Sequence, residues 1–256
     1  MGYGAFTHYI DIAQVALYGF WVFFAGLIYY LRREDKREGY PLESERSGNI
    51  RVQGFPAVPP PKTFRLRDGK TYQAPPGRED RRAIKSSAVA SYPGAPLGPS
   101  GNPMQDGIGP ASYVERENVP DLTAEGEDKI VPLRVAAGFS VAKEDPDPRG
   151  MEVIAADGKL GGTVRELWID RSEPQIRYLE VAAASGGRNV LLPINFARIN
   201  GRRRQVTVRS INAAQFAAVP GTQRSDQITL REEDQISGYF AGGYLYADPR
   251  RLEPLI

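Results

Sequence analysis

The sequence predicts a single N-terminal transmembrane α-helix, followed by a mainly β cytoplasmic domain with a small antiparallel barrel and a short C-terminal helix. Three observations support this fold class. An uncharged apolar run occupies residues 12–31, a stretch rich in proline and glycine follows to about residue 110, and short apolar runs separated by turn residues fill much of the rest. Short strands joined by tight turns are typical of small all-β barrels.

Residues 12–31 have the length of a membrane span. At about 1.5 Å per residue, a helix of this length covers roughly 30 Å, the thickness of the hydrocarbon core of a bilayer. The run is apolar on every side, whereas a helix in a soluble core is usually amphipathic. Residues 1–11 contain no Lys or Arg, which a cleaved signal peptide would have. We therefore expect a retained membrane helix.

Basic residues lie on one side of this run only. Four follow it closely and none precedes it: Arg32, Arg33, Lys36 and Arg37. By the positive-inside rule, residues 1–11 are periplasmic and the chain after residue 31 is cytoplasmic. Arg32 and Arg33, with the interfacial aromatic residues Tyr30 and Tyr40, are also candidate ligands for anionic lipid headgroups.

The composition excludes several classes of protein. The net charge is +2, with both signs mixed along the chain, which gives no nucleic-acid-binding footprint. The chain has no cysteine, and its one histidine, His8, lies beside the apolar run. A thiolate or histidine metal site and a Ser–His–Asp triad in the main domain are therefore excluded. With no phosphate-binding loop or hydrolase motif present, we expect no metal site and no enzyme activity.

Residues 32–110 form an extended segment without hydrophobic periodicity. Ten of the nineteen residues from Tyr92 to Pro110 are proline or glycine, which is typical of a disordered linker. Large apolar residues such as Phe55 nevertheless recur, and a flexible linker would not need them. We therefore favour a segment laid over the surface of a partner, with a short hairpin that turns at Asp68-Gly69.

Residues 111–256 form the predicted barrel domain. From Met151 onward, short apolar runs are separated by turn signals at Asp157-Gly158, Ser185-Gly186-Gly187 and Asn200-Gly201. A capping box from Thr229 to Glu232 begins the C-terminal helix, and Gly238 is its expected end. The aromatic residues that follow either cover one end of the barrel or form a docking surface.

Six segments, in order along nearly the whole chain, resemble a known family: FWVFFAGLIYYL (20–31), REGYPLE (37–43), PKTF (61–64), DGIGPASY (106–113), KIVPLRVAAGF (129–139) and REEDQISGYFAGGYLYA (231–247). They are similar to the H subunit of the purple bacterial photosynthetic reaction centre, and the barrel region resembles the PRC barrel.

This resemblance implies an accessory subunit that ligates no pigment itself. Such a subunit covers the cytoplasmic side of the L and M subunits, which hold bacteriochlorophyll, bacteriopheophytin, quinones and a non-haem iron. It stabilises that core and assists proton delivery to the secondary quinone during light-driven electron transport in the bacterial inner (intracytoplasmic or chromatophore) membrane. Membrane lipids are expected partners, and a cytochrome subunit and the light-harvesting antenna are further candidates.

The resemblance also implies residues for proton transfer. At the corresponding positions this chain has Asp121, Asp170, Glu173 and Arg177. Pro174 indicates that the last three lie at a loop between strands. Some members of the family carry two histidines at a surface metal site where this chain has Glu125 and Glu127. Carboxylates can still collect protons, but the loss of imidazole removes the best zinc ligands, so the metal site is not expected.

Two other functions stay open at this point. A membrane-anchored assembly adaptor would use its barrel only to recruit other proteins, and it would dissociate from a pigmented core in mild detergent. A membrane-tethered enzyme is the third alternative, and the lack of cysteine and histidine in the main domain argues against it.

Overall fold

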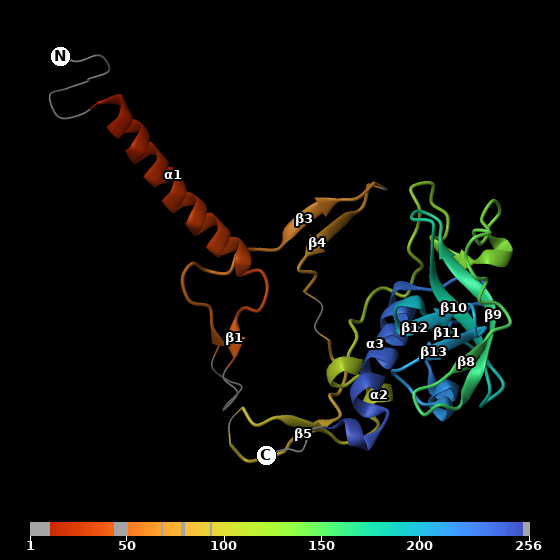
Figure 1. Ribbon diagram of the computed structural model, residues 1–256. Helices are drawn as coiled ribbons and strands as arrows, with labels where there is room; N and C mark the ends of the chain where they lie inside the picture. Colours follow the sequence, from red (N-terminus) through yellow and green to blue (C-terminus); the bar gives the residue numbers. More distant parts are fainter. Residues whose placement is uncertain (1–10, 44–50, 68, 78–79, 93, 253–256) are drawn as a thin grey trace. The chain divides into compact units, whose positions relative to one another are not determined.

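The computed structural model describes residues 11–43, 51–67, 69–77, 80–92 and 94–252. The chain divides into two compact units (Figure 1). The first comprises residues up to 81 together with 91–95, and the second comprises 82–90 and the chain from residue 96. The expected periplasmic segment lies outside the described residues apart from Asp11.

Helix α1, Ile12–Asp35, is the helix expected from the apolar run, and it extends four residues beyond that run. It begins at a capping box in which the Gln14 N–H donates to Asp11 Oδ1 (2.8 Å) and the Asp11 N–H donates to Gln14 Oε1 (3.3 Å). Among the described residues, α1 is the one helix long and apolar enough to cross a membrane. None of its side chains is buried, so its apolar surface can face lipid on all sides.

A buried lysine just after α1 binds a later segment of the chain. Lys36 is 1% exposed, and its Nζ donates to the carbonyl oxygens of Gln53 (2.5 Å) and Pro56 (2.6 Å). The same Nζ lies 4.8 Å from the centre of the Tyr40 ring. Lys36 therefore joins the end of the helix to a segment about twenty residues further along the chain.

Short paired strands follow α1. They are β1 (Leu42–Glu43) with β2 (Arg51–Val52), β3 (Lys62–Arg65) with β4 (Thr71–Ala74), and β5 (Ser86–Ala88) with β6 (Leu97–Pro99). The β3–β4 pair confirms the predicted hairpin. Gly69 has a φ of +82°, which glycine adopts without strain, whereas Asp68 lies outside the described residues. The short helices α2 (Pro103–Asp106) and η1 (Gly109–Ala111) come next.

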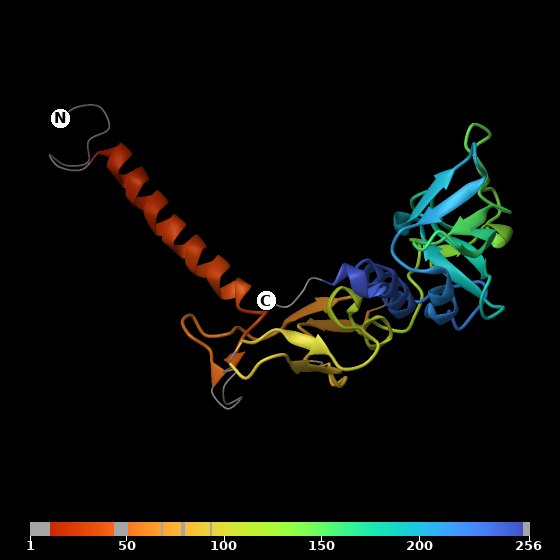
Figure 2. The same cartoon turned by 60° about the horizontal axis from the view of Figure 1, so that its bottom comes forward.

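Figure 2 shows the strands of the barrel region in green to blue. They form a seven-stranded sheet with the order β11-β10-β9-β8-β13-β12, and β7 pairs with β9. The strands are β7 (Ile130–Pro132), β8 (Glu152–Ile154), β9 (Leu160–Asp170), β10 (Gln175–Ala183), β11 (Asn189–Pro193), β12 (Ala197–Asn200) and β13 (Gln205–Val208). The predicted turns connect β8 to β9, β10 to β11 and β12 to β13. All pairings are antiparallel except β13 with β8, and the pairings leave β11 and β12 as the ends of the described sheet.

Helix α3, Leu230–Tyr246, begins at the predicted capping box but is longer than predicted. The expectation that Gly238 ends this helix is wrong, because Gly238 serves packing. A Cβ on Gly238 would lie 2.7 Å from the Ala111 carbonyl oxygen, and one on Gly242 would lie 2.5 Å from the Ala111 Cβ. Tyr239 and Phe240 are buried in the core, so this aromatic stretch mainly covers the sheet, while Tyr244 stays 52% exposed.

Candidate functional site

The predicted proton-transfer loop connects β9 to β10 at one end of the sheet. β9 ends with Asp170 and β10 begins with Gln175, so Glu173 and Pro174 lie in a turn, as expected. The expectation is wrong for Arg177, which lies within β10, because the loop ends at Pro174. Asp170 is 1% exposed, and its Oδ1 accepts the backbone N–H groups of Ser172 (2.9 Å) and Glu173 (3.1 Å). One oxygen of this buried carboxylate therefore shapes the turn that presents the exposed Glu173.

The second carboxylate oxygen of Asp170 faces Lys129. Lys129 Nζ lies 3.8 Å from Asp170 Oδ2 and 3.3 Å from Asp121 Oδ2. The backbone fixes this arrangement, because the Arg171 N–H donates to the Lys129 carbonyl (2.9 Å) and the Lys129 N–H donates to the Asp121 carbonyl (2.8 Å). The hydrogen bond to Asp121 and the charges of Asp170 and Glu173 raise the pKa of Lys129. Lys129 is thus a fixed cation among three carboxylates.

Glu125 and Glu127 lie on the turn that precedes β7. The Thr123 hydroxyl accepts the backbone N–H groups of Glu125 (3.3 Å) and Glu127 (3.4 Å), which places both residues on one tight turn. The Glu127 carboxylate pairs with Arg171, the residue next to Asp170. The Glu125 side chain is exposed and makes no hydrogen bond or ion pair with any other described residue. The structure therefore connects Glu127 to the β9–β10 turn and leaves Glu125 facing solvent.

Three residues of this site were not predicted from the sequence: Lys129, Tyr178 on β10 and Glu233 on α3. The Tyr178 hydroxyl donates to Glu233 Oε2 at 2.9 Å. Burial raises the pKa of Glu233 above its ordinary value, against the opposing effects of the Tyr178 hydrogen bond and the Arg177 charge. The charge of Asp121 raises it further, and the bridge between Pro120 and Thr229 brings the segment of Asp121 beside the start of α3.

Arg177 belongs to the same site through its charge. It lowers the pKa values of both Tyr178 and Glu233, although burial dominates and both remain raised. In the sequence, Glu233 directly follows Glu232, which closes the capping box of α3. Acidic residues are common in the first turn of a helix, because the helix dipole stabilises negative charge there. The sequence around Glu233 therefore gave no separate sign of a function.

The predicted lipid-binding residues lie at the end of α1. The Arg32 Nη2 donates to the Tyr40 hydroxyl at 3.2 Å, and the guanidinium lies 5.9 Å from the centre of the Tyr40 ring. Arg33 and Tyr30 are exposed on α1 and take no part in this contact. The structure thus brings together two of these four residues.

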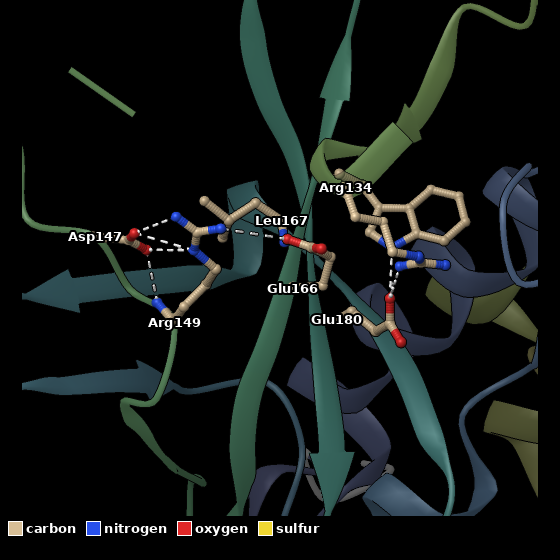
Figure 3. A network of polar contacts seen from close by, with 7 residues as sticks. Arg134, Asp147, Arg149, Glu166, Leu167 and Glu180 are labelled. Atoms are coloured by element: carbon tan, nitrogen blue, oxygen red, sulfur yellow. Dashed lines mark hydrogen bonds and ion pairs between the residues drawn. The ribbon is translucent and has the colours of Figure 1, made fainter. Parts of the chain in front are cut away.

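A separate polar network holds two carboxylates that do not belong to the site. Glu166 and Glu180 lie directly opposite each other on β9 and β10, an arrangement that destabilises a sheet when both are charged. Each has its own arginine (Figure 3): Arg149 lies 3.9 Å from Glu166, and Arg134 lies 3.4 Å from Glu180. The Trp168 Nε1 also donates to Glu180 at 3.0 Å. These contacts offset the repulsion across the sheet.

No metal centre is formed by the residues that the structure describes, because no group of three or more His, Cys, Asp or Glu side chains among them is suited to hold an ion. The absence of a metal site at Glu125 and Glu127 stays a prediction.

Comparison with protein families gives two matches. Residues 4–135, more than half of the chain, match the N-terminal region of the photosynthetic reaction centre H-chain. The chain belongs to the photosynthetic reaction centre H-chain family. Residues 141–215 of the H subunit match the PRC-barrel domain and contain strands β8 to β13.

The family assignment fixes the broad role of the chain. The H subunit is a structural subunit of an electron-transfer complex, where it associates with the L and M subunits. That complex carries pigments and quinones. Helix α1 makes this H subunit a membrane-anchored protein.

Proposed function

We propose that this H subunit assists proton delivery to the secondary quinone of the reaction centre. The route is a proton-uptake cluster, defined as Asp121, Glu125, Glu127, Lys129, Asp170, Glu173, Arg177 and Glu233. The observation that supports it is a graded series of carboxylates: Glu125 and Glu173 face solvent, Asp170 is buried, and burial raises the pKa of Glu233. A relay needs ionisable groups within reach of one another or of bridging water.

Each group of residues has a role in this proposal. Glu125 and Glu127 collect protons at the surface. Glu173 passes them inward, and Glu233, whose pKa is raised by burial, is the carboxylate that accepts them next. Lys129 keeps the facing carboxylates from repelling each other strongly. Proton delivery matters because a quinone that receives electrons without protons would be a buried anion without a partner, which is costly in a low-dielectric site.

Replacing Glu173 with glutamine tests this function. Gln keeps the size of the side chain and an oxygen that can accept from Gln175 Nε2, which donates to Glu173 at 3.1 Å, but it cannot carry a proton. We expect slower proton-coupled transfer of the second electron to the secondary quinone, with the first transfer and assembly near normal. The measurement is flash spectroscopy of assembled complexes across pH.

Glu152→Gln is the matched control, because Glu152 is an exposed glutamate on β8 outside the cluster. Identical rates in Glu173→Gln and the wild type at every pH would remove Glu173 from the route.

We also propose that the H subunit stabilises the L and M subunits from the cytoplasmic side through its extended segment. Large apolar side chains of this segment are exposed, including Phe55 (83%) and Ile84 (72%). Apolar surface of this kind marks protein contacts. The proline- and glycine-rich stretch then has a partner surface to lie on, as its apolar residues indicated.

The proposed orientation places the N-terminus in the periplasm and the barrel domain in the cytoplasm of the inner membrane. The one-sided basic charge after the span supports it. Arg32, Arg33, Tyr30 and Tyr40 would then meet lipid headgroups at the cytoplasmic interface. Protease added to inside-out vesicles should reach the barrel domain, and cleavage of that domain only in right-side-out cells would reverse the orientation.

A further inference from the structure

The β12–β13 hairpin carries an unusual concentration of positive charge. No acidic residue occurs between Glu180 and Asp226, while seven arginines do. Five of the seven belong to the hairpin and its flank: Arg198, Arg202, Arg203, Arg204 and Arg209. We name these five residues the arginine hairpin.

The arginine hairpin differs from other arginines of this region in lacking partners. Arg188 donates to the carbonyl of Ala217 (3.1 Å), and Arg224 pairs with Asp226 (3.1 Å). All five side chains of the arginine hairpin are exposed, and none makes a hydrogen bond or ion pair with another residue that the structure describes. Five exposed guanidinium groups without a partner among the described residues therefore lie on this hairpin and its flank.

Acidic side chains near the hairpin do not neutralise it. Asp147 senses the charge of Arg204, but Arg149 already binds Asp147 through two nitrogens, at 2.6 and 3.1 Å. Glu152 on β8 lies opposite Gln205, and Glu144 and Asp145 precede Pro146, which is close to Gly201 of the turn. None of these three described carboxylates makes an ion pair with the arginine hairpin. The five arginines outnumber these carboxylates and stay unpaired with them, so the hairpin keeps a net positive charge that a partner can meet.

The hairpin presents its arginines from a fixed backbone. β12 and β13 pair over four residues each, and the Arg203 N–H donates to Asn200 Oδ1 at 3.1 Å across the turn. Its apolar residues point inward, with Val206 and Val208 fully buried. Among the described residues, no exposed large hydrophobic side chain lies between residues 161 and 243.

This surface suits phosphate groups better than a protein partner. Protein interfaces usually have an apolar core, which the hairpin lacks. Arginine forms bidentate hydrogen bonds with phosphate, and basic residues near an anionic membrane bind its headgroups by charge alone. The chain is also tied to a bilayer by α1, which keeps lipid headgroups at high local concentration.

We infer that the arginine hairpin is a second membrane contact of this chain, which binds the phosphate groups of anionic lipids. At about 1 kcal/mol for each arginine near an anionic surface, the three turn residues Arg202, Arg203 and Arg204 together contribute roughly a hundredfold to the equilibrium constant of the contact.

The test uses the full chain in lipid nanodiscs. The chain has no cysteine, so Gln205→Cys accepts one fluorophore beside the hairpin. Lipids with a spin-labelled headgroup should quench this fluorophore in discs of phosphatidylcholine with phosphatidylglycerol, and not in discs of phosphatidylcholine alone. Added salt should reverse the quenching, because it screens exposed charges.

The triple variant Arg202→Gln, Arg203→Gln, Arg204→Gln should lose the quenching. The control Arg116→Gln, Arg224→Gln, Arg250→Gln removes the same charge from arginines that are paired within the chain, and it should retain the quenching. Equal quenching in both kinds of disc, or equal loss in the triple variant and the control, would overturn the inference. Polyglutamate should not protect the fluorophore from quenching in discs with phosphatidylglycerol. If polyglutamate prevents the quenching and phosphatidylglycerol cannot displace it, the inference is overturned and an acidic protein is the better partner.

Discussion

Replacing Lys36 with methionine tests how the extended segment is held at the end of α1. Methionine keeps most of the length and the apolar stem of lysine but loses the ammonium group. Two hydrogen bonds to carbonyl oxygens, from Gln53 and Pro56, and the contact with the Tyr40 ring are lost together. Because Lys36 is 1% exposed, no water replaces these bonds while the segment stays in place.

The size of the effect follows from these contacts. A hydrogen bond to a charged group contributes about 1.5–3 kcal/mol. When the segment opens, water can bind the two carbonyl groups and replace part of the lost interaction. We therefore use the lower value of this range for each of the two hydrogen bonds, which gives about 3 kcal/mol in total. Since about 1.4 kcal/mol is a factor of ten, local opening of the segment should become roughly a hundredfold more frequent.

Hydrogen exchange of the full chain in nanodiscs measures this opening directly. Backbone amides of residues 51–60 should exchange faster in Lys36→Met, while those of the barrel domain stay unchanged. The matched control is Lys62→Met, because Lys62 also contacts the end of α1, through Glu34, but is 44% exposed. An exposed pair contributes up to about 1 kcal/mol, so its effect should stay below about tenfold. Equal acceleration in the two variants would refute the reasoning.

Two further predictions concern the cluster and the complex. Burial raises the pKa of Glu233 in the folded protein, so its contribution to stability is favourable at acidic pH and is lost as pH rises from the unfolded-state pKa to the folded-state pKa. Glu233→Gln should therefore raise the free energy of unfolding by on the order of 1 kcal/mol or less above that window and leave it unchanged below, as measured by denaturant titration at several pH values. A pH-independent difference would assign the effect to packing. The H subunit should also stay with the pigmented core during chromatography in mild detergent, and its separation from the pigment absorbance would favour an assembly adaptor.

Local sequence signals predicted much of this fold because the corresponding interactions are local. The capping box at Thr229 needs only residues within one helical turn, and the turn at Asp157-Gly158 needs only its own backbone. Gly238 was misread as a helix end for the same reason. A glycine there usually ends a helix, but here it allows contact with Ala111, which lies far away in the sequence. The parallel pairing of β13 with β8 is likewise non-local and left no sequence signal.

The candidate site was predictable only in part, for a related reason. Asp170, Glu173 and Arg177 were found through the family resemblance, whereas the residues alone indicated an ordinary exposed turn. Lys129 and Glu233 gain their roles from contacts between separate elements, the segment before β7 and the first turn of α3. The sequence near Lys129 does not indicate its contact with the Asp170 carboxylate, and the sequence near Glu233 does not indicate its contact with the Tyr178 hydroxyl.

Burial and the number of fixed donors separate the carboxylates of this chain into two kinds. Glu180 accepts from Trp168 (3.0 Å), Arg134 (3.4 Å) and Asn189 (2.7 Å), so both of its oxygens are occupied within the sheet. Glu173 has one flexible partner and faces solvent, and its oxygens remain open to water. A carboxylate that takes up protons from solvent needs such open positions, because a proton must arrive and leave through a hydrogen bond that can be remade. The same side chain therefore stabilises the sheet where its acceptor positions are filled, and can transfer protons where they are free.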